Sequence, residues 1–224
     1  MKLPVIVVNF KTYQGSSGKK ALDLARIHQK VARKTGVSLA VAVQAVDLRM
    51  IVEEVDIPVF AQHFNVAEQG AFTGHITPHS LKEIGVYGSL LNHAEKKLTV
   101  EILERSIELA RDNGLFTIVC ADTPYAGKAV SEFDPDMVAV EPPELIGGDV
   151  SVTTASPQVI IDSVAMIGKG HVLVGAGIKT AEDVIASLRY GASGVLLASG
   201  VVKSDDPEKT LFDLVEGILK AGKD

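Results

Sequence analysis

Residues 137–148 have the sequence MVAVEPPELIGG, in which four apolar residues end at a carboxylate and two prolines, with a pair of glycines close behind. An apolar run this short, rich in Val, is typical of a strand that is buried on both faces of a parallel sheet. The prolines prevent the run from continuing as a central strand. The stretch therefore predicts a short buried strand followed by a loop that contains glycine.

The same arrangement recurs along the whole chain. Eight short apolar runs begin near Val5, Val37, Pro58, Gly88, Phe116, Met137, His171 and Gly194. Their mean spacing of roughly 27 residues leaves room for one helix after each strand. Alternation of strands and helices predicts a parallel sheet of the α/β class. Since there is no linker or break in composition, and no Gly-x-Gly-x-x-Gly after the first strand, we expect one closed (β/α)8 barrel over residues 1–224 rather than an open doubly wound sheet.

End signals predict the limits of several helices. An amphipathic pattern covers residues 16–35. Thr99 opens a second helix that stops at Asn113-Gly114, and Thr180 caps a third whose first turn is acidic. The last helix is expected from Asp206-Pro207 to Gly222.

Composition excludes several classes of protein. The chain is 46% apolar and 22% charged, which is typical of a globular domain. A net charge of −6 argues against nucleic acid or an anionic membrane as partner. No apolar stretch is long enough to span a membrane, and the N-terminus lacks the pattern of a signal peptide. The single cysteine cannot form an internal disulfide, so we expect a protein of the reducing cytoplasm.

In a (β/α)8 barrel, active sites lie at the carboxyl ends of the strands. The last two strands and the loop after residues 137–140 end in small residues whose backbone N–H groups can approach an anion: Gly147, Gly175, Ala176, Gly177, Ala198 and Ser199. Phosphate sites recur at this corner of such barrels. Taken singly, each of these residues could equally form an ordinary tight turn, but three such loops at one corner favour a phosphate site.

Three titratable residues also end strands, namely Glu141, His93 and Lys11, and Asn9 precedes Lys11 on the same side of its strand. Burial would raise the pKa of Glu141 and suit it as a general base. A turn or helix that begins after His93 would hold its imidazole neutral through the helix dipole. Each residue alone could be structural. Together they predict proton abstraction beside a carbonyl, with no metal and no cofactor.

These residues lie in motifs that resemble the triosephosphate isomerase family, in its shorter archaeal form, along the whole chain. Asn9-Phe10-Lys11 is similar to the motif on the family's first strand, and Asn92-His93-Ala94-Glu95 to that on its fourth. Residues 138–147 resemble the catalytic strand and mobile lid, and Gly175-Ala176-Gly177 and Ala198-Ser199 resemble the phosphate loops.

The resemblance implies a TIM barrel that interconverts dihydroxyacetone phosphate and glyceraldehyde 3-phosphate in glycolysis and gluconeogenesis, without a cofactor. Glu141 would be the base, His93 the electrophile and Lys11 the electrostatic partner, supported by Asn9 and Glu95. Residues 142–148 would be the lid. The resemblance also implies a homo-oligomer, because residues 70–75 are similar to a loop that inserts into a neighbouring subunit, and a tetramer is favoured over a dimer because archaeal members of the family tend to be tetramers.

Three positions differ from the usual family pattern, and one cysteine matches it. Ala94 stands where the family usually has Ser, and His75 where an acidic residue is common. Asp149 follows the lid, and we expect its carboxylate to face solvent. Cys120 matches a family cysteine and is expected to contribute packing only.

Two alternatives stay open from the residues. One is another phosphate-binding barrel enzyme, an aldolase or a synthase, although a Schiff-base aldolase would need a Lys where the sixth strand ends in Glu141. The other is a non-catalytic barrel that binds a phosphorylated metabolite.

Overall fold

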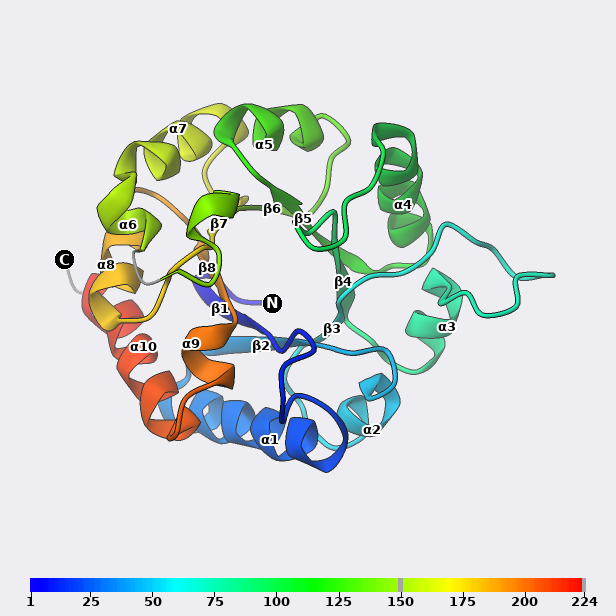
Figure 1. The fold of residues 1–224 in the computed structure, drawn as a ribbon, viewed down its shortest axis with the longest axis horizontal. Coiled ribbons are helices and arrows are strands. Elements are labelled where there is room, and N and C mark those ends of the chain that lie inside the picture. Colours follow the sequence, from blue (N-terminus) through cyan, green and yellow to red (C-terminus); the bar gives the residue numbers. More distant parts are fainter. Residues whose placement is uncertain (149–150, 223–224) are drawn as a thin grey trace.

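In the computed structural model, which describes residues 1–148 and 151–222, eight parallel strands close into a barrel in chain order, with β1 paired to both β2 and β8 (Figure 1). The strands are β1 (Val5–Asn9), β2 (Ser38–Val43), β3 (Val59–Ala61), β4 (Gly88–Leu91), β5 (Phe116–Ala121), β6 (Met137–Val140), β7 (Val172–Val174) and β8 (Gly194–Leu197). Each strand begins within one residue of its predicted start. The predicted (β/α)8 barrel is confirmed.

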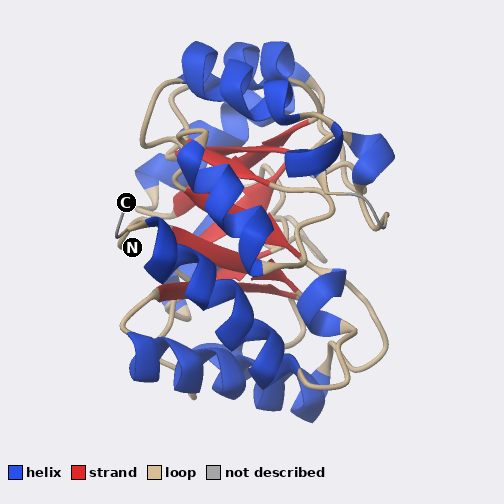
Figure 2. Ribbon diagram, turned by 90° about the vertical axis from the view of Figure 1, so that its left-hand side faces the viewer, coloured by secondary structure: helices blue, strands red, loops and turns tan. Residues whose placement is uncertain are grey.

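Helices surround the barrel and cover its strands on the outside, as the side view in Figure 2 shows. They are α1 (Gly18–Thr35), α2 (Leu48–Val52), α3 (Pro78–Glu83), α4 (Val100–Asp112), α5 (Pro124–Ser131), the 3₁₀ turn η1 (Pro143–Leu145), α6 (Val152–Ala155), α7 (Pro157–Ile167), α8 (Ala181–Arg189), α9 (Ser199–Val202) and α10 (Pro207–Ala221). Within residues 1–148 and 151–222, no helix is both long and apolar enough to cross a membrane.

The predicted helix ends are confirmed where a side chain caps them. The hydroxyl of Thr99 accepts a hydrogen bond from the backbone N–H of Ile102, and Thr180 forms a capping box with Asp183. Asp206 caps α10, which ends at Gly222 as predicted. Capping residues act within three or four positions of the chain, which is why the sequence alone locates them.

Alternation along each strand divides the core in two. In β1, Val5 and Val7 face the barrel interior, whereas Ile6 and Val8 face the surrounding helices. The interior is filled by side chains from all eight strands, Phe60 of β3 among them, so the barrel is a packed core and not a pore. A ligand can therefore bind only at one of its two ends.

One loop leaves the body of the molecule. Residues 62–77, between β3 and α3, extend well beyond the ring of helices in Figure 1. Phe72, within this loop, keeps 44% of its surface exposed. Large apolar side chains exposed on a projecting loop are typical of protein contacts.

Candidate active site

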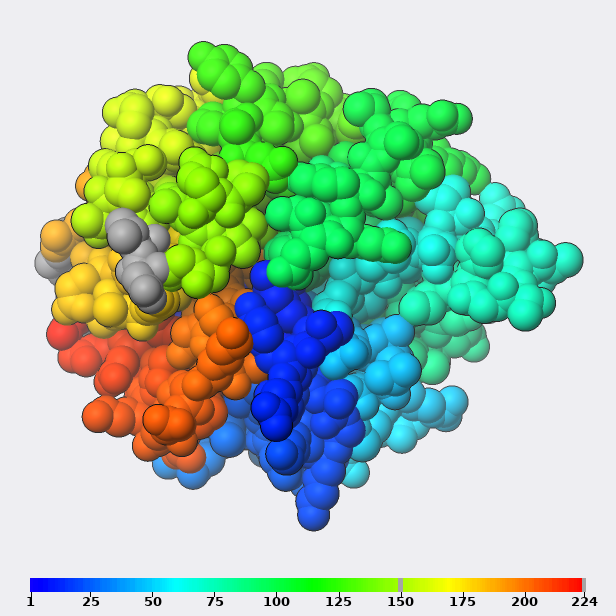
Figure 3. Space-filling model, viewed as in Figure 1, coloured from blue at the N-terminus to red at the C-terminus, as the bar shows by residue number. Residues whose placement is uncertain are grey.

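The carboxyl ends of the strands surround a cavity of about 30 Å³ that brings most of the predicted residues together. In Figure 3 the blue loop after β1, the green segment after β4, the yellow-green segment after β6 and the orange segment after β8 meet around the centre of this face. The predicted residues that line the cavity are Asn9, Lys11, His93, Glu141, Gly147, Ala176, Gly177, Ala198 and Ser199. Gly175 and Glu95 do not line it but contact residues that do.

Glu141 follows β6 and is 7% exposed. Its Oε2 atom is buried without a hydrogen-bond partner. Burial raises the pKa of Glu141 to about 7, although a hydrogen bond from Cys120 and the charge of Lys11 act in the opposite direction. A carboxyl group with this pKa can both take and release a proton near neutrality.

Gly175 leaves room for that carboxyl group. A Cβ atom at this position would lie 2.4 Å from Cγ of Glu141 and 2.5 Å from its Oε1. These distances are far inside van der Waals contact, so a side chain at position 175 would displace the base. The sequence predicted Gly175 for a phosphate loop, and the structure adds this steric reason for a glycine.

His93, which follows β4, has a defined tautomer. Its Nδ1 accepts a hydrogen bond of 3.1 Å from the backbone N–H of Glu95, so in the neutral ring the proton lies on Nε2. That Nε2 atom lies 3.8 Å from Oε2 of Glu141. Burial, together with the charge of Lys11, lowers the pKa of His93.

The expected contribution of a helix dipole at His93 is wrong. Residues 93–96 form a turn, closed by a hydrogen bond from the N–H of Lys96 to the carbonyl of His93, and α4 begins only at Val100. The imidazole is kept neutral by burial and by the cationic neighbour rather than by a helix terminus.

Lys11 is held in position at its ammonium group and at its backbone. Its Nζ lies 2.8 Å from Oε1 of Glu95, which gives Glu95 the supporting contact that the resemblance implied. The backbone of Lys11 has a φ of 49°, in the left-handed region, and its N–H donates to Oδ1 of Asn9. Such a conformation persists only where the surroundings impose it.

Gln62, at the end of β3, supplies part of that constraint. Its Nε2 donates to Oδ1 of Asn9 and to the carbonyl of Lys11, both at 3.1 Å. No function was predicted for Gln62 from the sequence. Its position at the carboxyl end of a strand was the signal that could have identified it.

Two further contacts around the site were also missed. Tyr13 lines the cavity, and Nζ of Lys203 lies 4.4 Å from the centre of its ring. Cys120 is buried as expected, but its thiol also contacts Glu141 by a hydrogen bond. No local pattern in the sequence connects either pair.

The small residues line the cavity from the loops that follow β6, β7 and β8. Gly147, Ala176 and Gly177 have φ values of 72°, 71° and 75°, so successive N–H groups there do not follow a strand or a helix. Backbone in this conformation can present N–H groups to an anion. The arrangement is therefore suited to a phosphate group. Asp149 lies outside the described residues.

A larger cavity, of about 780 Å³, lies at the other end of the barrel. Its charged groups are already paired within the protein: Arg111 with Asp134, and Asp136 with the backbone N–H and hydroxyl of Thr117. It contains no buried acid without a partner. Size alone would select this cavity, but the predicted catalytic residues line the smaller one.

The chain matches the family model described as triosephosphate isomerase over residues 4–218. It is 46% identical to the triosephosphate isomerase of Methanocaldococcus jannaschii over 218 residues, which cover 96% of this chain and 100% of that protein. It is 43% identical to that of Methanosarcina barkeri, over 96% of this chain and 99% of the relative. The protein of the same name from Pyrobaculum calidifontis is 40% identical, over 99% of each.

Proposed function

Since this chain belongs to the triosephosphate isomerase family and interconverts dihydroxyacetone phosphate and glyceraldehyde 3-phosphate, we propose that Glu141, His93 and Lys11 carry out the proton transfer. The observation that carries the proposal is the unpartnered Oε2 of Glu141, buried 3.8 Å from Nε2 of His93. A substrate bound between these atoms would give Oε2 of Glu141 and Nε2 of His93 the hydrogen-bond partners that they lack within the described part of the chain.

Glu141 acts as the base. Its carboxylate takes a proton from the carbon next to the substrate carbonyl and returns it to the neighbouring carbon. With a pKa of about 7, neither the charged nor the neutral form of the carboxyl group is strongly favoured, so transfer in both directions is fast. Two substrate carbons can share one base because the carboxyl group faces both.

His93 and Lys11 stabilise the enediolate that forms between the two transfers. The Nε2–H of neutral His93 donates to the oxygen on which negative charge develops. The ammonium group of Lys11, fixed by Glu95, adds a positive charge that does not have to move during the reaction. No metal or cofactor is needed for this chemistry.

The phosphate group of the substrate lies against Gly147, Ala176, Gly177, Ala198 and Ser199, whose small size leaves backbone N–H groups accessible, and Gly175 begins the loop that carries two of them. Residues 142–148 act as a lid that closes over it. Closure excludes water from the enediolate and strengthens each electrostatic contact.

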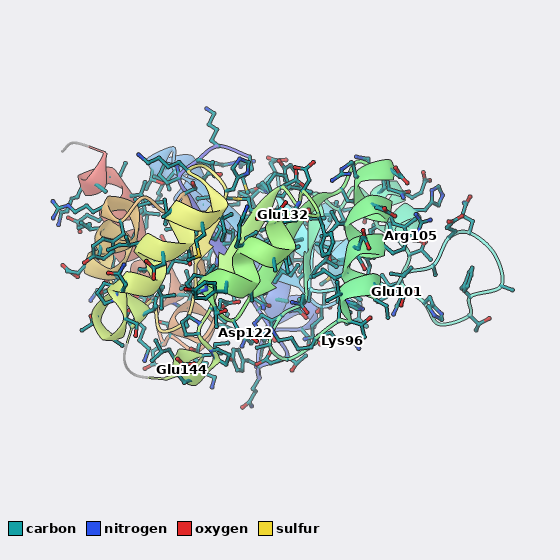
Figure 4. All side chains as sticks on the ribbon, turned by 90° about the horizontal axis from the view of Figure 1, so that it is seen from above. Lys96, Glu101, Arg105, Asp122, Glu132 and Glu144 are labelled. Carbon is teal, nitrogen blue, oxygen red and sulfur yellow. The ribbon has the colours of Figure 1, made fainter. Side chains whose placement is uncertain are left out.

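The assignment is tested with a coupled assay on glyceraldehyde 3-phosphate. We expect Glu141→Gln to lower kcat by about 10³-fold, because the amide cannot accept the proton. Glu101→Gln is the matched control, since Glu101 is an exposed carboxylate in the first turn of α4, away from the cavity lining (Figure 4). Equal rates for wild type and Glu141→Gln would contradict the proposal.

We further propose that the chain is a cytoplasmic homo-oligomer, with a tetramer favoured over a dimer. Two separate sets of exposed apolar side chains support this assembly: Val46 and Phe72 on loops, and Val100, Ile102 and Tyr125 on α4 and α5. Two sets of contacts suit two kinds of interface. Light scattering should give a smaller mass for Phe72→Asp than for the wild-type protein. A wild-type mass equal to that of one chain would contradict the oligomer.

A further inference from the structure

One buried carboxylate outside the cavity lining connects two loops of the site. Asp183 lies in the first turn of α8 and is 8% exposed. Its Oδ2 accepts three hydrogen bonds of 3.0 Å, from the backbone N–H groups of Lys179 and Thr180 and from the hydroxyl of Thr180. This oxygen therefore holds the end of the phosphate loop that begins at Gly175.

The other oxygen of the same carboxylate faces the segment that follows the lid. Oδ1 of Asp183 accepts a hydrogen bond of 2.7 Å from the hydroxyl of Thr153, in α6. Since Thr153 has one hydroxyl proton and gives it to the carboxylate, the 2.9 Å contact between Ser151 and Thr153 has the Ser151 hydroxyl as donor. The Ser151 oxygen in turn accepts from the backbone N–H of Thr153.

A backbone hydrogen bond joins the same two segments. The N–H of Val152 donates to the carbonyl of Ala176 at 3.2 Å, and Ala176 lines the cavity with a φ of 71°. Asp183 and Val152 thus attach the start of α6 to residues 176–180 at two points. Of these, only the carboxylate reaches both segments through side-chain groups.

The ionisation of Asp183 suits this bridging position. Burial raises its pKa, but hydrogen bonds from Thr153, Lys179 and Thr180 outweigh that effect and lower it. An ionised carboxylate accepts hydrogen bonds at both oxygens. A neutral amide of the same size could serve only one of the two loops with an acceptor.

We propose that Asp183 is a positioning residue that holds the chain after the lid and the phosphate loop in register, so that both meet the phosphate group of the substrate. The inference rests on the proposed function, because it assumes that this corner binds phosphate. A helix cap alone would need the contacts of Oδ2 only, and the bond from Thr153 is what distinguishes the two interpretations.

The decisive variant is Thr153→Val, which removes the hydroxyl that reaches Asp183 and leaves the cap of α8 intact. We expect kcat/KM for glyceraldehyde 3-phosphate to fall about tenfold, because a small displacement of a positioning loop is costly. The rate with glyceraldehyde, which has no phosphate, should change by less than about twofold. The inhibition constant of inorganic phosphate should rise, and Thr153→Ser should restore the wild-type values.

Two further variants separate positioning from stability. Asp183→Asn keeps the size of the side chain but loses one acceptor, and we expect the same selective loss on the phosphorylated substrate. Asp206→Asn changes the cap of α10 in the same way, away from the cavity lining. It should lower Tm without changing the ratio of the rates with glyceraldehyde 3-phosphate and with glyceraldehyde. Circular dichroism checks that each variant is folded.

The outcomes are distinct. Equal losses on both substrates in folded Thr153→Val, or no loss on either, would overturn the inference. If Glu141→Gln is inactive in the same assay while Thr153→Val behaves as wild type, the proposed function stands and only this inference fails. If Glu141→Gln retains full activity, the acid–base assignment itself is wrong.

Discussion

The two ends of the barrel differ in what their polar groups still lack. At the carboxyl ends of the strands, a cavity of about 30 Å³ contains a buried carboxylate oxygen with no partner. At the other end, a cavity of about 780 Å³ is lined by charged groups that are paired within the protein. The comparison teaches that an unsatisfied buried acid indicates function better than volume does.

Backbone strain follows the same division, with one exception. Among the described residues, four that are not glycine have positive φ values: Lys11, Asn92, Asp134 and Ala176. Three of them follow strands at the catalytic end, where two line the cavity. The fourth, Asp134, lies at the other end and forms an ion pair with Arg111. At the carboxyl ends of the strands, the contacts that maintain this strain also hold Lys11 and Ala176 against the cavity.

The largest effect that can break this comparison is expected from Gly175→Ala. The added methyl group would lie 2.4 Å from Glu141, and moving the base by about 1 Å should lower kcat roughly 100-fold. Gly114→Ala, at the opposite end, makes the same change at a φ of 63° and should lower stability but not kcat. A fully active Gly175→Ala variant would show that Glu141 does not need its observed position.

The dependence of activity on pH is the next largest effect. The base must be ionised, and the pKa of Glu141 is about 7, so kcat/KM should be constant well above pH 7. Below pH 7 it should fall about tenfold for each pH unit as the carboxylate is protonated. The measurement is a profile of kcat/KM from pH 5 to pH 9; constant activity down to pH 5 would exclude a base with this pKa.

A change at the opposite end should affect stability alone. Thr117 is buried, and its hydroxyl donates to Asp136 and accepts from the N–H of the same residue. Thr117→Val should lower the free energy of unfolding by about 1–2 kcal/mol, because it removes the two hydrogen bonds that the hydroxyl makes with Asp136. Thermal unfolding measures this loss, and kcat/KM should stay at the wild-type value. A loss of activity at constant fold would show that the two ends are coupled.

The smallest effect is expected from Arg111→Ala at the same cavity. The Arg111 side chain is half exposed and pairs with Asp134, so the variant should lose no more than about 1 kcal/mol. The unfolding midpoint in urea, compared with that of Thr117→Val, tests the order. A larger loss than in Thr117→Val would mean that the exposed pair is more important than the buried hydroxyl.

Much of this molecule could be predicted because its signals are local. The strand starts, the cap at Thr99 and the grouping of Lys11, His93 and Glu141 at strand ends follow from periodicity and from the rule that barrel sites lie at the carboxyl ends of strands. The match to the family over residues 4–218 also leaves the aldolase, synthase and binding-protein alternatives without support.

The failures have one cause. The neutral state of His93 was attributed to the dipole of a turn or helix after it, and the structure has only a turn there; Gln62, Tyr13 and the bridging contacts of Asp183 were not identified. Each of these depends on a neighbour that is distant in the chain: Gln62 on Asn9 and Lys11, Asp183 on Thr153. No periodic pattern contains such pairs.

By itself, the sequence determined the alternation of strands and helices and the ends of the capped helices, because short-range sterics and hydrogen bonds set them, and it placed the acid–base candidates at strand ends. Only the tertiary structure decided that Oε2 of Glu141 lacks a partner, that His93 keeps its proton on Nε2, and that one carboxylate joins two loops. These properties arise when the barrel closes and brings distant groups together away from water, where burial and fixed neighbours set protonation and position.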